Sequence, residues 1–153
     1  MMNLCSEVIK VLAGRTLVTA ESCTGGGIGR ALTAVSGASA VFKGGVISYC
    51  NELKQHLLGV QASDLDRFGA VSAPVAEAMA LGAREHMNAD VAVSVTGLAG
   101  PGGDEYGNPV GTVYIGYADR NLVCSRKFLF SGGREEVRQS AIEAALRLIL
   151  EMN

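Results

Sequence analysis

The stretch that decides the fold is Leu17-Val18-Thr19-Ala20-Glu21-Ser22-Cys23-Thr24-Gly25-Gly26-Gly27. An apolar, partly β-branched run ends at a carboxylate, two hydroxyls and a thiol, and three glycines follow. An amphipathic pattern begins at once, with Ile28 and Leu32 at helical spacing. Glycine lets backbone N–H groups approach a ligand closely, and the start of a helix favours negative charge. The stretch therefore predicts a strand that turns into a helix, around an anion or around a nucleophilic Ser22 or Cys23.

Short apolar strands alternate with helical patterns along the rest of the chain. The expected strands are residues 16–21, 45–49, 91–96, 111–119 and 122–130, and the expected helices are residues 4–13, 25–35, 51–58, 63–68, 72–88 and 134–150. This alternation is typical of a layered α/β domain. The last two strands read as a hairpin around Asp119-Arg120-Asn121, which requires an antiparallel pair. The sequence therefore predicts a single α/β domain over residues 1–153, with a mixed sheet of about five strands.

Composition narrows the class of protein. The chain has 153 residues, a formal net charge of −2 and no tryptophan. The length is that of one domain, and the charge balance gives no reason to expect a nucleic acid or an anionic membrane as partner. No apolar run approaches the roughly 18 residues of a membrane span, and residues 1–7 lack the long apolar stretch of a signal peptide. We therefore expect a cytoplasmic protein with no membrane contact and no nucleic-acid partner.

Cysteine and histidine usage argues against a disulfide scaffold and against a metal site. The four cysteines form no CxxC pair, which is typical of a reduced, cytosolic chain. The two histidines belong to no HExxH motif and to no Cys/His cluster, so neither a structural zinc ion nor a cofactor is expected. His56 lies in a short helical segment and His86 near a helix end, where surface positions are expected.

The glycine clusters match no known phosphate or hydrolase motif. Neither GxGxxG nor GxxxxGK[ST] occurs, which leaves a dinucleotide fold and a Walker-type ATPase unsupported. GxSxG and SxxK are also missing, and two surface histidines argue against a Ser-His-Asp triad. A serine nucleophile would then need a lysine or a tyrosine as its base.

Polar side chains gather where the expected strands end. Ser22, Tyr49 and Thr96 lie at the ends of three strands, and Lys54 comes five residues after Tyr49. Strand ends and the loops after them meet at one edge of an α/β sheet, so these residues can converge. A lysine desolvated among glycine-rich backbone can have a lowered pKa and accept the serine proton. By spacing alone, a solvated Lys54 and a core-capping Tyr49 remain alternatives.

Cys23 competes with Ser22 for the role of nucleophile. A thiol at a helix N-terminus can be acidified and reactive. Consecutive residues at a strand end point in opposite directions, so only one of the two is expected to face the site. The residues alone leave both possibilities open.

A second glycine cluster and a pair of arginines could complete a site. Residues 96–104 are too rich in glycine for a plain hairpin. Their amides could form an oxyanion hole, and a surface Ω-loop is the alternative. Arg134 and Arg138 lie four residues apart at the start of the last helix, hence on one face. A phosphate contact, a subunit contact and a plain surface position are the alternatives for this pair.

Five blocks of the chain together resemble the CinA C-terminal domain family. They are Ala20-Glu21-Ser22-Cys23-Thr24-Gly25-Gly26, which is similar to the family's AESxTGG signature; Gly44-Gly45-Val46-Ile47-Ser48-Tyr49 with Asn51 and Lys54; Gly69-Ala70-Val71-Ser72; Thr96-Gly97-Leu98-Ala99-Gly100-Pro101-Gly102-Gly103; and Pro109-Val110-Gly111-Thr112-Val113. The blocks come in the family's order, and the resemblance covers about residues 4–150. It implies a three-layer α/β/α domain. For active members it also implies hydrolysis of the carboxamide of nicotinamide mononucleotide to nicotinate mononucleotide and ammonia, within pyridine nucleotide recycling.

The resemblance also implies roles for individual residues. The serine nucleophile falls on Ser22 and its partners on Lys54 and Tyr49, whereas Cys23 falls at a position that varies in the family. The substrate- and oxyanion-binding positions that it implies are Thr24, Gly25, Gly26, Thr96, Gly97, Gly100 and Arg134. The chain departs from the family at Gly133, where Gly-Asp-Arg is frequent. Longer relatives carry an N-terminal domain linked to metal-dependent pyrophosphatase activity, which a chain of this length is not expected to contain.

Together these observations predict a serine amidohydrolase that acts on a small-molecule nucleotide without a metal ion. Ser22 would attack the carboxamide carbon, Lys54 would act as general base and then as proton donor to ammonia, and Tyr49 would orient or relay that proton. A catalytically silent nucleotide-binding module and a hydrolase that depends on Cys23 are the alternatives. Small enzymes of this kind are often symmetric dimers, so a homodimer is expected.

Overall fold

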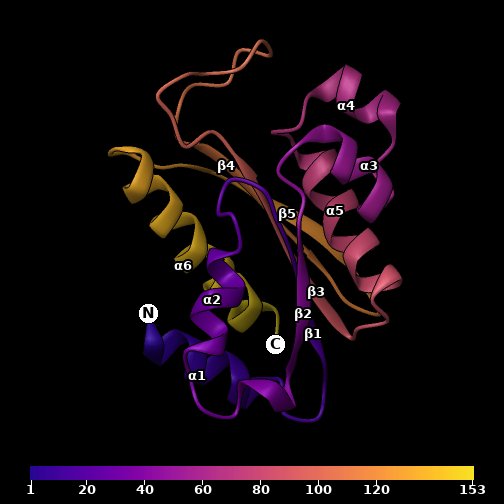
Figure 1. Cartoon of the computed structure of the whole chain (residues 1–153), viewed down its shortest axis with the longest axis vertical. Coiled ribbons are helices and arrows are strands. Elements are labelled where there is room, and N and C mark those ends of the chain that lie inside the picture. The colour runs from indigo at the N-terminus through magenta and orange to yellow at the C-terminus, as the bar shows by residue number, and fades with distance from the viewer.

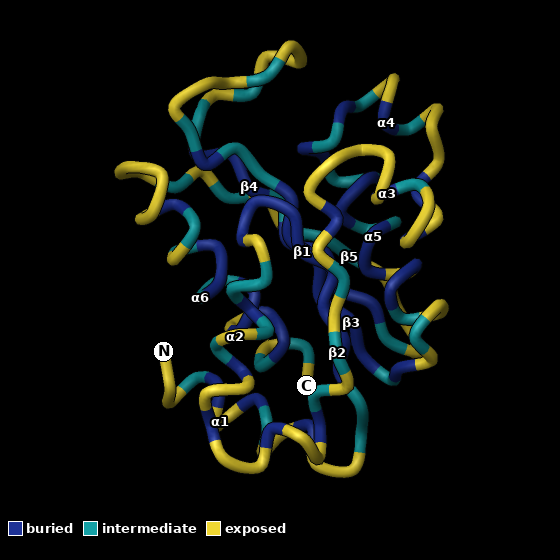
Figure 2. The backbone as a smooth tube through the Cα atoms, viewed as in Figure 1, coloured by how far each residue is buried: buried dark blue, intermediate teal, exposed yellow.

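The two central strands come from two of the most apolar runs in the sequence. In the computed structural model, which describes residues 1–153, β1 (Leu17–Glu21) and β3 (Val91–Gly97) are parallel neighbours (Figure 1). Every residue of the two strands is buried except Gly97, which is partly exposed, so both strands appear dark blue at the centre of the molecule in Figure 2. Continuous apolar runs of this kind are typical of strands that helices cover on both faces.

The other three strands complete a mixed sheet. β2 (Phe42–Ile47) pairs in parallel with the free side of β1. β4 (Thr112–Ala118) pairs antiparallel with β3, and β5 (Val123–Leu129) pairs antiparallel with β4. The order across the sheet is therefore β2-β1-β3-β4-β5. The predicted hairpin and the mixed five-stranded sheet are both confirmed.

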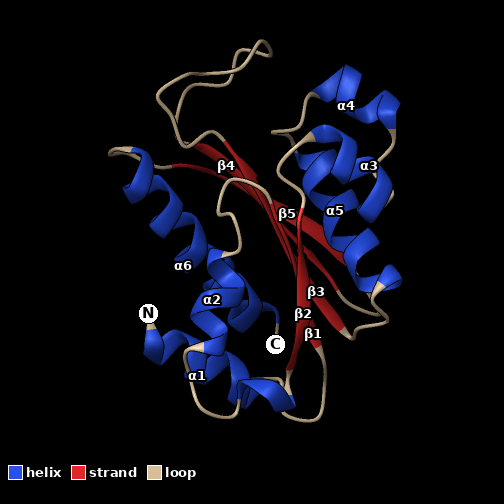
Figure 3. Cartoon of the chain, viewed as in Figure 1, coloured by secondary structure: helices blue, strands red, loops and turns tan.

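Helices cover both faces of this sheet, which confirms the three-layer α/β/α arrangement (Figure 3). One layer holds α1 (Met2–Val11), α2 (Gly27–Thr33) and α6 (Arg134–Met152), and the other holds α3 (Asn51–Leu58), α4 (Ala62–Phe68) and α5 (Ala73–His86). A short 3₁₀-helix, η1 (Ala38–Ala40), precedes β2. No helix is both long enough and apolar enough to cross a bilayer.

The core has two parts because the central strands alternate their side chains between the two helical layers. Leu17 of β1 and Val93 of β3 belong to the larger cluster of 23 buried residues, together with α1, α2 and α6. Val18 and Ala92, their neighbours in sequence, belong to the smaller cluster of 10 buried residues, together with α5. The sheet is thus fixed from both sides, and the strand ends are held in place for the site.

Strand β2 differs from its predicted bounds of 45–49, because it runs from Phe42 to Ile47. The glycines that suggested the start of the strand lie inside it. A Cβ at Gly45 would come 2.1 Å from Thr19 Oγ1, so only glycine allows β1 to approach this closely. Ser48 and Tyr49 consequently follow the strand and form the loop that leads to α3.

The topology places the ends of β1, β2 and β3 at one edge of the sheet. From β1 the chain continues through α2 to β2 on one side, whereas from β3 it continues to β4 on the other side. Adjacent strands whose connections diverge in this way leave a crevice at their carboxyl ends, which is where α/β proteins bind ligands. Ser22 follows β1 at this crevice.

Candidate active site

Glu21, the last residue of β1, fixes the turn into α2. Its side chain is 2 % exposed. One carboxylate oxygen accepts hydrogen bonds from the Thr24 hydroxyl (2.7 Å) and the Ile28 N–H (2.9 Å), and the other accepts one from the Gly29 N–H (3.0 Å). The carboxylate thus pairs two of the amides that the first turn of a helix leaves without partners. The residues between Glu21 and Ile28, Ser22 among them, are closed into a tight loop.

Ser22 is held by the backbone on both sides. Its N–H donates to Val95 O of β3 (3.0 Å), and its carbonyl accepts from the Gly25 N–H (3.0 Å). The side chain remains available, and its Oγ lies 3.0 Å from Lys54 Nζ. Two residues 32 positions apart in the sequence are therefore within hydrogen-bonding distance, in a nearly fully buried environment.

Lys54, in the first half of α3, is 1 % exposed and has no carboxylate within ion-pair distance. Besides Ser22 Oγ, its Nζ contacts Ser48 O (2.9 Å) and Tyr49 O (3.4 Å). Nζ donates to all three of these oxygens. A neutral amine keeps two N–H donors for the carbonyls and has one lone pair, which can accept the proton of the Ser22 hydroxyl. Burial without a counter-charge lowers the pKa of Lys54 below its ordinary value of 10.5. The surroundings thus favour the form that can accept a proton from Ser22.

Cys23 lines the same cavity as Ser22, which corrects the expectation that only one of the two faces the site. The alternation of a strand does not extend to Cys23, because β1 ends at Glu21 and a turn follows. Burial raises the pKa of the Cys23 thiol to about 11, against the nearby positive charges of Arg138 and Lys54. The thiol is therefore protonated at neutral pH, which makes it a weak nucleophile.

A cavity of about 280 Å³ opens beside Ser22 and Lys54. The strand ends and the loops after them supply its walls. Its lining residues are Ser22, Cys23, Tyr49, Asn51, Lys54, Ala70, Val71, Thr96, Gly97, Leu98, Ala99, Gly100, Gly102 and Arg134. The structure thus brings together Ser22, Tyr49, Lys54, Thr96, Gly97, Gly100 and Arg134 of the predicted site residues.

Tyr49 and Arg134 form the rim of this cavity. Arg134 donates one hydrogen bond to Gly100 O (2.6 Å) and another to the Tyr49 hydroxyl (3.1 Å). The Tyr49 side chain is 60 % exposed, and only its backbone carbonyl contacts Lys54. The structure therefore places the phenol beside Arg134 rather than beside the Ser22–Lys54 pair.

Thr96 and Gly97 form the wall that β3 contributes. The Thr96 hydroxyl donates to Ala70 O (2.8 Å) and thereby ties the end of β3 to the segment before α5. A Cβ at Gly97 would come 2.6 Å from a methyl group of Val113, so a larger residue would push β4 away. Both residues shape the cavity, and the Thr96 hydroxyl proton is already used inside the protein.

Thr24, Gly25 and Gly26 do not line the Ser22 cavity. They line a neighbouring hollow together with Arg30 and Arg138. The Thr24 hydroxyl is occupied by Glu21, and Gly25 and Gly26 have φ values of 58° and 96°, which favour glycine. In this structure the three residues shape the turn behind Ser22.

Two contacts at the site had no counterpart in the sequence prediction. One is the capping of α2 by Glu21, for which a carboxylate just before a helix start is a readable signal. The other is the guanidinium of Arg138, which donates to Cys23 O (3.1 Å) and Thr24 O (3.4 Å) from α6. No local pattern indicates that second contact, because 114 or 115 residues separate the partners.

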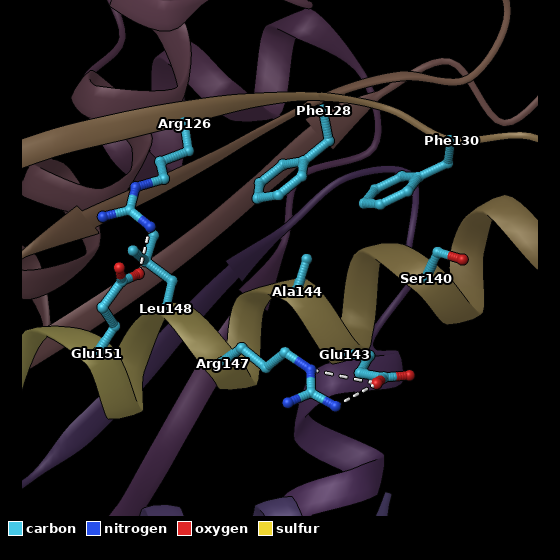
Figure 4. Close-up of a pocket in the computed structure, with 9 residues that line it drawn as sticks. All are labelled: Arg126, Phe128, Phe130, Ser140, Glu143, Ala144, Arg147, Leu148 and Glu151. Atoms are coloured by element: carbon cyan, nitrogen blue, oxygen red, sulfur yellow. Dashed lines mark hydrogen bonds and ion pairs between the residues drawn. The ribbon is translucent and has the colours of Figure 1, made fainter.

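A further cavity, of about 470 Å³, lies between β5 and α6 and away from Ser22 (Figure 4). The rings of Phe128 and Phe130 stack over α6 with their centroids 5.2 Å apart. Charged groups surround these rings, and they pair with one another as Arg126–Glu151 and Arg147–Glu143. No nucleophile paired with a base lines this cavity, and the Ser22 cavity is therefore the candidate active site.

Comparison with known proteins matches the whole chain to one family. A family model described as the CinA C-terminal domain matches residues 2–153. The CinA-like protein of Thermosynechococcus vestitus is 52 % identical over 152 residues, which is 96 % of this chain and 36 % of that protein. The chain thus spans about a third of the length of the curated relatives it matches.

Solved structures share the fold over nearly their full length. The competence/damage inducible protein CihA from Agrobacterium tumefaciens is 40 % identical with a TM-score of 0.95, and the match covers 99 % of this chain and 94 % of that one. A CinA superfamily protein from Escherichia coli is 35 % identical with a TM-score of 0.96, and the match covers 99 % and 89 %. The arrangement of strands and helices described above is therefore common to these proteins.

Proposed function

This chain belongs to the CinA C-terminal domain family, and from that premise we propose that it is a serine amidohydrolase that releases ammonia from nicotinamide mononucleotide. The observation that carries the proposal is the 3.0 Å distance between Lys54 Nζ and Ser22 Oγ, in a cavity where Lys54 has no counter-ion. The geometry supports the reaction class, and the family resemblance supports the substrate.

In the first half-reaction, Ser22 gives its proton to Lys54 as its Oγ attacks the carboxamide carbon. The carbonyl oxygen becomes an oxyanion. The amide of Cys23 follows the nucleophile, belongs to a residue that lines the cavity and donates to no other protein oxygen, so it is the candidate donor. One such donor is worth about 3 kcal/mol of transition-state stabilisation. The C–N bond then breaks, and Lys54 returns the proton to the nitrogen that leaves as ammonia.

In the second half-reaction, water replaces ammonia in the cavity. Lys54, neutral again, accepts a proton from the water as its oxygen attacks the ester carbon. The bond to Ser22 Oγ then breaks, Lys54 returns the proton to that oxygen, and the product leaves as a carboxylic acid that loses its remaining proton to water. Each proton transfer of the cycle runs through Lys54, which the structure holds within hydrogen-bonding distance of Ser22 Oγ, so the proposed cycle needs no further protein base.

The charges at the rim favour one orientation of the nucleotide. With the carboxamide at Ser22, Lys54 occupies the inner end of the cavity and Arg134 its exposed rim. A guanidinium binds a phosphate through paired donors, so we assign the phosphate to the Arg134 side. Arg134 can exchange its exposed bonds to Gly100 O and Tyr49 for the phosphate oxygens at low cost.

Incubation of the purified protein with nicotinamide mononucleotide tests the proposal. Ammonia and nicotinate mononucleotide are expected in equal amounts. Ser22→Ala and Lys54→Met should each lower kcat by at least about 1,000-fold, because nucleophile and base act as a unit. Ser39→Ala and Lys10→Met, at exposed positions, serve as matched controls and should retain wild-type rates.

The same measurements distinguish the proposed amidohydrolase from a catalytically silent nucleotide-binding module and from a hydrolase that depends on Cys23. Thermal stabilisation by the nucleotide without any product would indicate a silent binding module. Full activity in Ser22→Ala would indicate that another group, such as Cys23, is the nucleophile. A mass increase on the peptide that contains Ser22, trapped by acid quenching during turnover, would identify the acyl-enzyme directly.

A further inference from the structure

The two amides directly after Ser22 donate a hydrogen bond to no other residue of the protein. The neighbouring amides are occupied: the Ser22 N–H donates to Val95 O and the Gly25 N–H donates to Ser22 O, whereas the Cys23 and Thr24 N–H groups donate to no other residue. In a trans peptide the N–H points opposite to the carbonyl of the preceding residue. The direction of the Cys23 amide is therefore set by Ser22 O, and that of the Thr24 amide by Cys23 O.

The Gly25 N–H donates to Ser22 O and so holds the first of these two peptides. Arg138 donates to Cys23 O and so holds the second. Arg138 Nε donates to Cys23 O (3.1 Å), and one Nη donates to Thr24 O (3.4 Å). The other Nη pairs with Glu135 (2.9 Å), which orients the guanidinium from within α6. All three nitrogens are thus used inside the protein, and the two that reach the turn contact only backbone carbonyls.

We propose that Arg138 is a positioning residue of the hydrolytic site, which holds the peptides after Ser22 so that the amide of Cys23, a residue that lines the cavity, faces the oxyanion. The proposal rests on the proposed function, because it assigns this amide a role in that reaction. The positive charge beside the Cys23 and Thr24 carbonyls also polarises the two peptides, which makes the Thr24 and Gly25 N–H groups stronger donors. Arg138 itself touches no reacting atom.

Replacement of Arg138 should affect the chemical step more than substrate binding. In Arg138→Ala, we expect kcat to fall about 10- to 100-fold with KM changed less than about threefold, which is below the loss for a deleted oxyanion donor. Guanidinium chloride at millimolar concentration should restore part of kcat, whereas sodium chloride should not. Arg138→Lys should retain intermediate activity, and it provides the same readout if the alanine variant fails to fold.

Two matched variants test whether the loss of kcat in Arg138→Ala comes from the lost contact between Arg138 and the turn after Ser22. Arg30→Gln removes an exposed arginine that lines the same hollow as Arg138 and whose guanidinium makes no hydrogen bond. The kinetics of this variant should therefore match those of the wild type. Glu135→Gln removes the ion pair but leaves the bonds of Arg138 to the turn. A KM that rises in Arg138→Ala while kcat is kept would show that Arg138 binds substrate, and this would overturn the proposal.

An NMR measurement separates failure of this proposal from failure of the proposed function. The backbone amide resonances of Cys23 and Thr24 should shift in Arg138→Ala and in Arg138→Lys, and should not shift in Arg30→Gln. A wild-type protein that releases no ammonia, but whose variants show these shifts, would refute the amidohydrolase and leave the positioning role in place. Unchanged shifts would refute the positioning role, whether or not ammonia is released.

Discussion

Glu21 and Lys54 are both buried beside Ser22, yet their charges are compensated to different degrees. Glu21 accepts three hydrogen bonds from the turn that it closes, which compensates the carboxylate for the lost water. Lys54 contacts two carbonyls and one hydroxyl but no carboxylate. The uncompensated burial lowers its pKa. Glu21 thus fixes the turn that contains Ser22, and the lowered pKa of Lys54 suits the role of base that is proposed for it.

The lowered pKa of Lys54 predicts a pH-dependent stability difference between the wild type and Lys54→Met. At low pH the lysine is protonated in both the folded and the unfolded state, and the fold carries the cost of burying the charge. As pH rises through the lowered pKa, the folded state releases its proton while the unfolded state keeps it up to about 10.5. The unfolded state then binds more protons, so the free energy of unfolding of the wild type rises with pH.

Urea unfolding at a series of pH values below 10.5 measures this effect. Lys54→Met should be most stabilised relative to the wild type at the lowest pH, and the difference should shrink as pH rises. Lys10→Met, at an exposed position, should show no such trend. A stability difference for Lys54→Met that is independent of pH would contradict the lowered pKa.

Helices α3 and α5 pack so closely that position 82 admits only glycine. A Cβ at Gly82 would lie 1.8 Å from Leu58 O, the last carbonyl of α3. The atom that it would meet belongs to the backbone, so no side-chain rotation can relieve the clash. Lys54 lies one turn before Leu58 on α3, and the contact between the two helices therefore sets the distance from Lys54 to Ser22.

Gly82→Ala should separate the two helices and lower both stability and activity. Alanine gains about 1 kcal/mol of helix propensity over glycine, but overpacking against a backbone atom costs about 1–3 kcal/mol. We therefore expect a net loss of stability in urea unfolding, and a lower kcat because Lys54 moves away from Ser22. Leu81→Ala, at an exposed position on the same helix, is the control and should retain kcat. Wild-type stability and kcat in Gly82→Ala would contradict this account of the contact.

The elements that the sequence predicts well are those whose pattern is set by local chemistry. The buried run of β3, the hairpin of β4 and β5, and the start of α5 at Ser72 with Pro74 follow from periodicity and turn residues. The start of β2 does not, because Gly45 reads as the first residue of the strand, whereas the strand begins at Phe42. Gly45 is needed inside the strand because Thr19 of β1 lies against it, and a single-sequence pattern does not contain that contact.

At the scale of the whole molecule, the sheet order determines which parts of the site are rigid. Ser22 follows β1, which is paired on both sides and lies between two helical layers. The convergence of Ser22, Lys54 and Thr96 could be predicted because the ends of parallel strands share one edge. The partners of the Tyr49 hydroxyl and of Arg138 could not, since they depend on where α6 packs after the chain has turned through β4 and β5.

The order of the strands, β2-β1-β3-β4-β5, predicts a gradient of hydrogen-exchange protection across the sheet. Amides of β1 and β3 are buried and paired on both sides, so they should exchange only through global unfolding, at rates that urea accelerates strongly. Amides of β2 and β5 lie at the two edges and should exchange by local opening, with little dependence on urea. The Ser22 N–H, which donates to Val95 O of β3, should thus exchange more slowly than the amides of the loop at Tyr49, which follows an edge strand. Native-state exchange followed by NMR measures the gradient residue by residue, and repetition at a lower protein concentration is its control. Protection of β5 equal to that of β3, lost on dilution, would contradict an open edge and would show that a second copy of the chain covers it.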